Sequence, residues 1–320
     1  MGNRVPPARS FNTVKHSNRD KRIKRQQKLR LLILGMFAVT ALLLLMLVIF
    51  VICSIASSAR PDEPQKPEDI IQYEAITKSS TLHTKIGPLI VINKSNSFNP
   101  SYSNLITLSN STIPVLEGKP IYKTEKIGIQ IHPDAKAAFD DMMKVYGNAS
   151  NITVTDAYRS LDAQSGYTIP KGQSDHHSAY LIALDIDGDV STHWIQQNCH
   201  KYGFVIRYPS DKSSVTGIPY NYMEAIRYVG VAHATYMNAN NLCLEEYVRL
   251  LQTSYTIDAQ LQINGADGNL YSVYYVPASN GDVTQFRVPS NFDYEISGDN
   301  MNGFIVTVNL SSPIATEAAE

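Results

Sequence analysis

The sequence predicts a mixed α+β domain that follows one N-terminal membrane helix and precedes a small all-β module. Three observations lead to this prediction: an uncharged apolar run near the N-terminus, helix-like and strand-like segments interleaved through the middle of the chain, and strand-like alternation near the C-terminus. With 320 residues, 43% of them hydrophobic, the chain is long enough to bury a substantial core.

The N-terminal segment predicts a basic cytoplasmic tail and a membrane anchor. Residues 1–30 contain ten Lys or Arg and one acid, a net +9, and because the whole chain carries −1 the remainder carries −10. Leu31 to Ile55 is a run of 25 residues without a charge, which is enough to cross a hydrocarbon core of roughly 30 Å. Lys and Arg favour the cytoplasmic side, so we expect the N-terminus inside and the rest of the chain outside the cell membrane. The acidic remainder argues against nucleic-acid binding.

The next segments predict a tether, a strand and a helix. Residues 56–84 are rich in Pro and charge, which is typical of a linker. Ile86–Lys94 is apolar and strand-like, and it opens the domain that we place at residues 85–254. Pro133 and Gly147 bracket an amphipathic helix. Its predicted apolar face consists of Ala137, Phe139, Met142, Met143 and Tyr146.

The rest of the chain alternates between the two kinds of element. The segments 151–160 and 204–209 predict strands, 191–203 predicts a helix that ends at Gly203, 223–230 a short strand or turn, and 233–252 a further helix. From residue 255 the pattern becomes that of a small β module, residues 255–310, with a hairpin at Ala266-Asp267-Gly268 and a tail at 311–320.

Six short motifs follow one another within residues 85–252 and carry a specific resemblance. They are YRSLDAQ (Tyr158–Gln164), SDH (Ser174–His176), KYGFVIRYP (Lys201–Pro209), TGI (Thr216–Ile218), RYVG (Arg227–Gly230) and LCLEEY (Leu242–Tyr247). In this order they resemble the VanY-type D-alanyl-D-alanine carboxypeptidase family, zinc enzymes that remove the terminal D-Ala of peptidoglycan stem peptides. The resemblance implies an antiparallel sheet flanked by helices, and it leaves the anchor and the β module outside.

The resemblance also implies a zinc site, which this chain matches only in part. The family pattern S-x-H-x-x-G-x-x-x-D supplies a His and an Asp ligand, and E-P-W-H-F-R-Y-V-G supplies the basic Glu and a His ligand. His176 matches the first ligand, whereas Ala183 and Ala225 occupy the other two ligand positions. Tyr222 stands at the position of the catalytic base. Zinc is therefore implied by the family but poorly supported by these residues.

Two acids offer a way to rebuild the metal site. Asp185 lies two residues beyond Ala183, about 6.5 Å further along a strand, and a β-bulge between it and His176 would return it to the site. Glu224 neighbours Ala225 but would face away in an extended segment. A catalytic zinc needs three protein ligands and an open position. An active enzyme with shifted ligands and a site that has lost its metal both remain open.

The resemblance further implies a substrate clamp that is retained. Arg159, Gln164 and Ser174 match the residues implied to hold the terminal carboxylate and backbone of the substrate. An Arg fork suits a carboxylate because it donates two charge-assisted hydrogen bonds. Asp156 departs from the family's Ser, and its acid could compete for Arg159.

These observations favour a single-pass, extracytoplasmic protein of a bacterial cell wall that binds peptidoglycan stem peptides through a catalytically impaired site. One alternative is an active zinc D,D-carboxypeptidase with shifted ligands. Another is a scaffold that binds a protein partner through the β module. Cys199 and Cys243 both fall in the segment expected outside the membrane, where a disulfide and two buried thiols are both compatible with the sequence.

Overall fold

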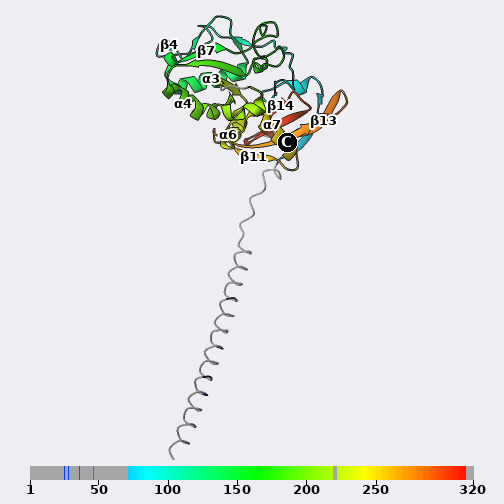
Figure 1. Cartoon of the computed structure of the whole chain (residues 1–320). Helices are drawn as coiled ribbons and strands as arrows, with labels where there is room; N and C mark the ends of the chain where they lie inside the picture. Colours follow the sequence, from blue (N-terminus) through cyan, green and yellow to red (C-terminus); the bar gives the residue numbers. More distant parts are fainter. Residues whose placement is uncertain are drawn as a thin grey trace, which may run out of the picture. The chain divides into compact units, whose positions relative to one another are not determined.

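A five-stranded sheet forms the framework of the domain that carries the motifs (Figure 1). Its strands lie in the order β5 (Lys123–Thr124), β7 (Ile152–Asp156), β8 (Leu181–Ile186), β10 (Tyr222–Tyr228) and β9 (Phe204–Tyr208). β5 and β7 are parallel, and the other neighbours are antiparallel. The expected combination of a mainly antiparallel sheet with flanking helices is thus confirmed in outline.

The computed structural model describes residues 71–218 and 222–314, together with the isolated positions 25, 28, 36 and 46. Apart from those four positions, the predicted basic tail (1–30) and membrane helix (31–55) lie outside the described residues. Within the described ranges, no helix has both the length and the apolar character needed to cross a membrane. The membrane anchor therefore stays a prediction.

Helix α3 (Pro133–Tyr146) begins and ends where the sequence predicts. The side chain of His132 accepts the backbone N–H of Asp134, and Pro133 suits the first turn because it has no N–H to leave unpaired. Gly147 ends the helix with a φ of +73°, a conformation that costs glycine little.

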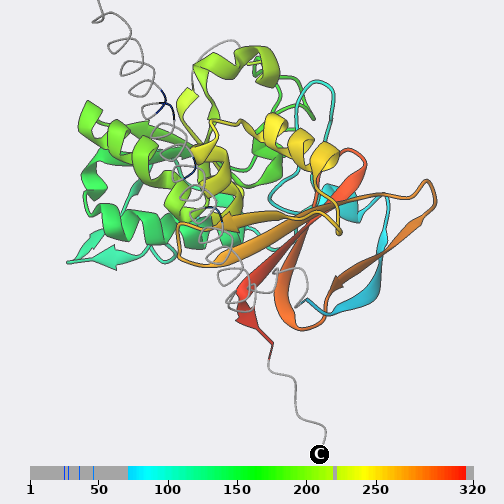
Figure 2. The ribbon, with the colours of Figure 1, turned by 90° about the horizontal axis from the view of Figure 1, so that it is seen from below.

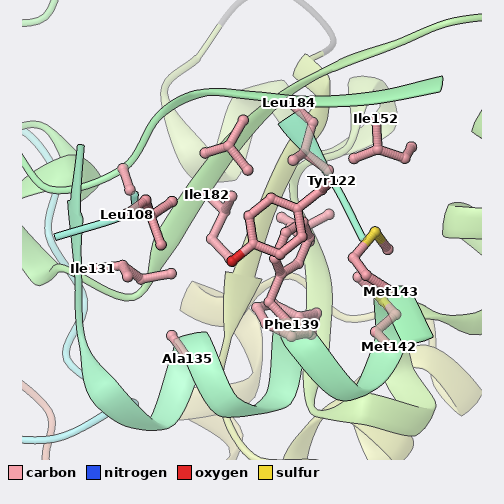
Figure 3. Close-up of a cluster of buried hydrophobic side chains, with 14 of the residues drawn as sticks. Leu108, Tyr122, Ile131, Ala135, Phe139, Met142, Met143, Ile152, Ile182 and Leu184 are labelled. Carbon is pink, nitrogen blue, oxygen red and sulfur yellow. The ribbon is translucent and has the colours of Figure 1, made fainter. Parts of the chain in front are cut away.

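The core of the domain lies between α3 and one face of the five-stranded sheet (Figure 3). It includes Phe139, Met142 and Met143 from the helix and Ile152, Ile182 and Leu184 from the strands. The predicted apolar face of the helix is one position wrong. Ala137 is exposed, and Ala135 points into the core instead.

The predicted second helix is α4 (Asp189–Asn198), which continues as the 3-10 turn η4 (Cys199–Tyr202). Gly203 ends this segment with a φ of +84°, and a Cβ there would lie 2.8 Å from Cε2 of Tyr228. The remaining short elements are η1 (His83–Lys85), η2 (Ala149–Asn151), η3 (Asp175–Ser178), η5 (Ser210–Lys212), α5 (Ser213–Thr216), and the ribbons β2 (Ile106–Thr107) with β6 (Gln130–Ile131) and β3 (Val115–Leu116) with β4 (Lys119–Pro120).

A second sheet accounts for the predicted β module. Its order is β11 (Leu261–Asn264), β12 (Leu270–Pro277), β15 (Gly303–Pro313) and β14 (Phe292–Gly298), all antiparallel. The predicted hairpin at Ala266-Asp267-Gly268 joins β11 to β12. Strand β13 (Val283–Pro289) pairs instead with β1 (Tyr73–Ser79), which lies in the segment expected to be a tether. That part of the tether prediction is wrong, because all seven β1 residues pair with β13.

The β module is not separated from the rest by a boundary near residue 254. Helices α6 (Val231–Ala239) and α7 (Leu244–Ser254) pack against the second sheet, below them in Figure 2. One core is shared by both parts and contains, among others, Val91, Met237, Val248, Leu251, Leu261, Val273 and Ile305. The described residues from 71 to 314 accordingly belong to one compact unit.

The middle of the segment Ile86–Lys94, from Leu89 to Ile92, is buried, whereas Ile86 is exposed, and the segment is not the expected strand. Its backbone hydrogen bonds go to separate acceptors. The N–H of Leu89 donates to Oγ of Ser297 at 2.9 Å, and the N–H of Val91 donates to the carbonyl oxygen of Asp299 at 3.0 Å. Apolar content therefore predicted its burial but not its hydrogen-bond pattern.

Removing the β module should unfold the domain. A chain that stops after Ser254 loses the sheet that covers α6 and α7, and so exposes apolar side chains of the shared core. We expect this truncation to aggregate or to lose its cooperative unfolding transition, measured by circular dichroism during heating. A chain that stops after Ile314 is the control and should melt like the full chain. Cooperative melting of the shorter chain at an unchanged temperature would contradict the shared core.

Candidate functional site

The two vacant ligand positions lie side by side on neighbouring strands. Ala183 of β8 is the direct cross-strand partner of Ala225 of β10. Directly opposed residues of an antiparallel pair share one face of the sheet. The adjacent pair, Ile182 and Ile226, faces the α3 core. Because neighbouring residues of a strand point to opposite faces, the two alanines face away from that core. The motif matching thus places both positions at one point of the sheet, and neither offers a metal donor.

A β-bulge adds a third residue to this point. Asp156 at the end of β7 pairs with Ala183, whereas Val154 pairs with Leu184, so one extra residue lies on β7. Bulges re-aim the side chains that follow them. Here the bulge brings Asp156 opposite Ala183. The expectation that a bulge would return Asp185 is wrong, because β8 keeps regular pairing with β10 and Asp185 stays opposite Thr153, exposed.

His176 retains the orientation of a potential ligand. It belongs to η3, and its Nδ1 is hydrogen-bonded to the carbonyl oxygen of Ala157. Since a carbonyl only accepts, Nδ1 carries the proton and Nε2 keeps a free lone pair. Burial, followed by the nearby Arg159, lowers the pKa of His176 to about 4. The ring is therefore neutral at pH 7.

The adjacent His177 is structural. Its Nε2 accepts the N–H of Gly172 at 3.1 Å, and its Nδ1 donates to the carbonyl oxygen of Arg159 at 2.7 Å. Both ring nitrogens are therefore used inside the protein, and the side chain is fully buried.

The residues present do not fit a catalytic zinc ion. In the described part of the chain, no three His, Cys, Asp or Glu side chains come together in a way that could hold a metal. His176 stands alone, because Ala183 and Ala225 have no donor, and Glu224 is exposed beside Ala225. Tyr222, at the position of the catalytic base, pairs with Tyr208 through its backbone, and its side chain lies outside what the structure describes.

The predicted clamp residues Arg159 and Gln164 do come together. Nη1 of Arg159 donates to Oε1 of Gln164 at 3.2 Å, and Nε2 of Gln164 donates to the carbonyl oxygen of Ile169 at 2.8 Å. The guanidinium lies 3.8 Å from the ring centroid of Tyr167. The expected competitor is also present, because Nε of Arg159 donates to Oδ2 of Asp156 at 2.6 Å.

Ser174, the third clamp residue, directly precedes η3. Two hydrogen bonds join η3 to the backbone of Arg159. The N–H of Arg159 donates to the carbonyl oxygen of His176, and the carbonyl oxygen of Arg159 accepts from Nδ1 of His177. Ser174 is 1% exposed, and its Oγ has no hydrogen-bond partner among the described residues. A buried hydroxyl without a partner is uncommon in folded proteins and is costly unless a bound molecule supplies the partner.

A buried ion network holds η3 on the sheet, and sequence reasoning did not identify it. Oδ2 of Asp175 accepts from Nε of Arg207 at 2.7 Å and from Nε of Arg227 at 3.0 Å. Glu245 of α7 accepts two further hydrogen bonds from Arg207, at 3.0 and 2.8 Å. Burial opposes the charge of Asp175, but Arg227 and Arg207 hold its pKa below the ordinary value. The available signal was a single Arg that follows apolar residues in each of two strands, FVIRY and AIRY.

Aromatic side chains line the approach to η3. Nε2 of His132 and the hydroxyl of Tyr180 are 3.1 Å apart, and Tyr180 is buried. The hydroxyl of Tyr102 donates to the carbonyl oxygen of Ser178 at 2.6 Å. Tyr102 also packs edge-on against Tyr158, with 5.7 Å between the ring centroids.

Both cysteines of the described domain are free. Cys199 and Cys243 are buried thiols, and burial raises the pKa of each to about 12. The alternative of a disulfide between them is therefore not supported.

Comparison with known proteins shows which fold this chain shares and which family model it matches. The fold is shared with the vancomycin resistance D,D-dipeptidase VanXYg, solved in complex with a D-Ala-D-Ala phosphinate analogue: the TM-score is 0.63 at 24% identity, covering 74% of this chain and 99% of that one. The family model described as VanY, D-alanyl-D-alanine carboxypeptidase, matches residues 166–231.

Two curated relatives agree with that model. A D-alanyl-D-alanine carboxypeptidase of Enterococcus faecium is 36% identical over 187 residues, which is 53% of this chain and 58% of the relative. The bifunctional D-Ala-D-Ala dipeptidase and carboxypeptidase VanXYC of Enterococcus gallinarum is 34% identical over 84 residues, 26% of this chain and 44% of the relative. The resemblance to the VanY-type D-alanyl-D-alanine carboxypeptidase family is thus confirmed, although the chain spans little more than half of the first relative.

Loss of the Asp175 charge should strongly destabilise the domain. In Asp175→Asn, Arg207 and Arg227 stay fully buried with one anionic partner fewer, and we expect a loss of about 3–5 kcal/mol of unfolding free energy. Because the folded pKa of Asp175 is lowered, this stabilisation is present at neutral pH and is lost as the pH falls through that pKa. Urea denaturation of the full chain measures it. The exposed Asp141→Asn is the control, and an equally small effect for both variants would contradict the network's role.

Supplying the two missing ligands should create a zinc site. In Ala183→Asp combined with Ala225→His, the new donors are cross-strand neighbours beside the region of His176. We expect zinc affinity to rise by at least about two orders of magnitude over that of the unaltered chain, because three protein ligands replace one. Competition with a chromogenic chelator measures this, and adding His176→Ala should abolish the gain. No gain in the double variant would show that the three positions do not converge.

Proposed function

We propose that this chain is a membrane-anchored, extracytoplasmic relative of the D-Ala-D-Ala carboxypeptidases that binds peptidoglycan stem peptides without hydrolysing them. One observation carries the proposal. The peptide-holding residues are kept in a connected arrangement, with the Ser174 hydroxyl buried and unpartnered, while both alanines stand where metal ligands are required. A bound peptide oxygen would supply the partner that this buried hydroxyl lacks among the described residues.

The chemistry of the site suits recognition of a peptide end. The Arg159 guanidinium and the Ser174 hydroxyl can donate to peptide oxygens, and neutral His176 offers an acceptor at Nε2 for a peptide N–H. Hydrolysis at this point would require an activated water. The described residues provide no metal site that could activate it. Among them, the acid positioned beside His176 is Asp156. Asp156 is already engaged with Arg159.

The two alternatives receive less support. An active zinc enzyme with shifted ligands needs Asp185 near His176, and Asp185 instead stays in the regular strand register. A scaffold that acts through an independent β module needs a module with its own core, and this one shares its core with α6 and α7. The extracytoplasmic location and the anchor rest on the basic and apolar N-terminal sequence alone.

A ligand-observed NMR experiment tests the proposal. The full chain is mixed with a stem pentapeptide that ends in D-Ala-D-Ala, with zinc added. We expect the intact peptide to receive saturation from the protein, with no free D-Ala methyl signal, and we expect this transfer to be lost in Arg159→Ala, which removes the guanidinium from the site. Arg249→Ala, at an exposed position of α7, is the matched control and should bind like the unaltered chain.

Two results would count against the proposal. Growth of free D-Ala that is abolished by a chelator and by His176→Ala would establish an enzyme. An absence of saturation transfer at millimolar peptide would remove stem-peptide binding.

A further inference from the structure

The guanidinium of Arg159 is already bonded to a carboxylate of its own chain. Oδ2 of Asp156 lies 2.6 Å from Nε, and both side chains are largely buried, at 11% exposure for Asp156 and 14% for Arg159. Tyr167 covers one face of the guanidinium, and Gln164 accepts from Nη1. Any ligand oxygen that approaches Arg159 therefore meets a partly satisfied group.

Asp156 is fixed in this position by more than its contact with Arg159. The N–H of Ala157 donates to its Oδ1 at 3.0 Å, and Nζ of Lys126 lies 3.4 Å from Oδ2. The β7 bulge sets its register opposite Ala183. Burial acts to raise its pKa, but the positive charges of Arg159 and Lys126 outweigh burial and lower it. Asp156 is therefore a rigid, ionised group at neutral pH.

The geometry of these contacts limits how Arg159 can bind. A guanidinium holds a carboxylate in two-point fashion through the edge formed by Nε and one Nη, or through the edge formed by both Nη atoms. Asp156 uses the Nε donor of the first edge, and Gln164 is bonded to Nη1 of the second. Each Nη carries two N–H groups, so the contacts among the described residues leave one N–H of Nη1 and both of Nη2 without a partner. Because Nε is occupied and the fixed charge of Asp156 lies beside it, an uncharged acceptor oxygen fits this remainder better than a second carboxylate does.

We propose that Asp156 is the specificity-determining residue of this pocket, which selects peptide ends that present an uncharged carbonyl, such as a carboxamide or a continuing peptide bond, over a free terminal carboxylate. This inference rests on the proposed function and names the ligand class of the same site. Asp156 repels a second carboxylate and keeps the Nε donor occupied, whereas an amide or peptide carbonyl accepts one hydrogen bond from Nη2 without like-charge repulsion. Selectivity thus arises from a fixed charge built into the pocket.

Paired ligands test this proposal on the full chain. The probes are a stem pentapeptide with a free D-Ala-D-Ala carboxylate and the same peptide with a C-terminal carboxamide, titrated at neutral pH by calorimetry. For the unaltered chain we expect the amide to bind more tightly than the acid. For Asp156→Asn and Asp156→Ser we expect the acid to tighten by about tenfold or more, as when a charge-assisted hydrogen bond is gained, and the amide by less than about threefold.

Controls separate specificity from folding. Asp162→Asn makes the same charge change at a neighbouring exposed aspartate, whose side chain is 99% exposed, and should leave both affinities unchanged. Asp156 is replaced by two different residues so that the test still holds if one of the variants misfolds. Thermal melting identifies a misfolded variant.

The outcomes distinguish this inference from the proposed function. An unaltered chain that prefers the acid by tenfold or more, or Asp156 variants that bind both peptides with an unchanged ratio, would overturn the role of Asp156 while leaving stem-peptide binding intact. If neither peptide binds the unaltered chain or any variant, the proposed function itself fails, and this inference fails with it.

Discussion

The contact between Asp175 and two buried arginines is the constraint on which the candidate site depends. Asp175 is the first residue of η3, Arg207 lies on β9 and Arg227 on β10, so one carboxylate joins the turn that carries His176 to the sheet. Arg207 extends the network to Glu245 of α7, and Arg227 extends it to the carbonyl oxygen of Ile90. A buried charge persists only when its partners satisfy it. The position of η3, the packing of α7 and the path of the 86–94 segment are therefore set together.

This scaffold accounts for how a site that, as we propose, lacks the family's metal ligands can keep its shape. Ala183 and Ala225 project from paired strands whose other face is buried against α3, so the strands do not need ligand side chains at these two positions to stay in place. The carbonyl oxygen of Ala157 holds His176 in the tautomer protonated at Nδ1, and Ser174 stays buried directly before η3. Most of the binding geometry is thus maintained by residues that have no role in chemistry, and it can outlast the chemistry.

Several features were predictable because their signals are local. Pro133 and Gly147 bracket α3, Gly203 ends η4, and the Asp267-Gly268 turn joins β11 to β12. The spacing of the motifs correctly put two empty ligand positions together. What could not be predicted depends on pairing between distant residues. Three features cannot be read from neighbouring residues in the sequence, because each depends on which distant segments pair. They are the bulge that brings Asp156 opposite Ala183, the pairing of β1 with β13, and the contact of Asp175 with both arginines. For the same reason, the apolar segment 86–94 was assigned as a strand although it has no strand partner.

The pairing of β1 with β13 has a mechanical consequence. The chain preceding Tyr73 enters the described fold through β1, whose seven residues are antiparallel partners of Val283–Pro289. A load directed along this strand is shared by all of the inter-strand hydrogen bonds at once, because they must shear together rather than open one after another. The ribbon packs through Phe286 and Val288 onto the second sheet, which itself shares the core of α6 and α7. Tension applied at the N-terminal connection would thus act first on the pairing of β1 with β13.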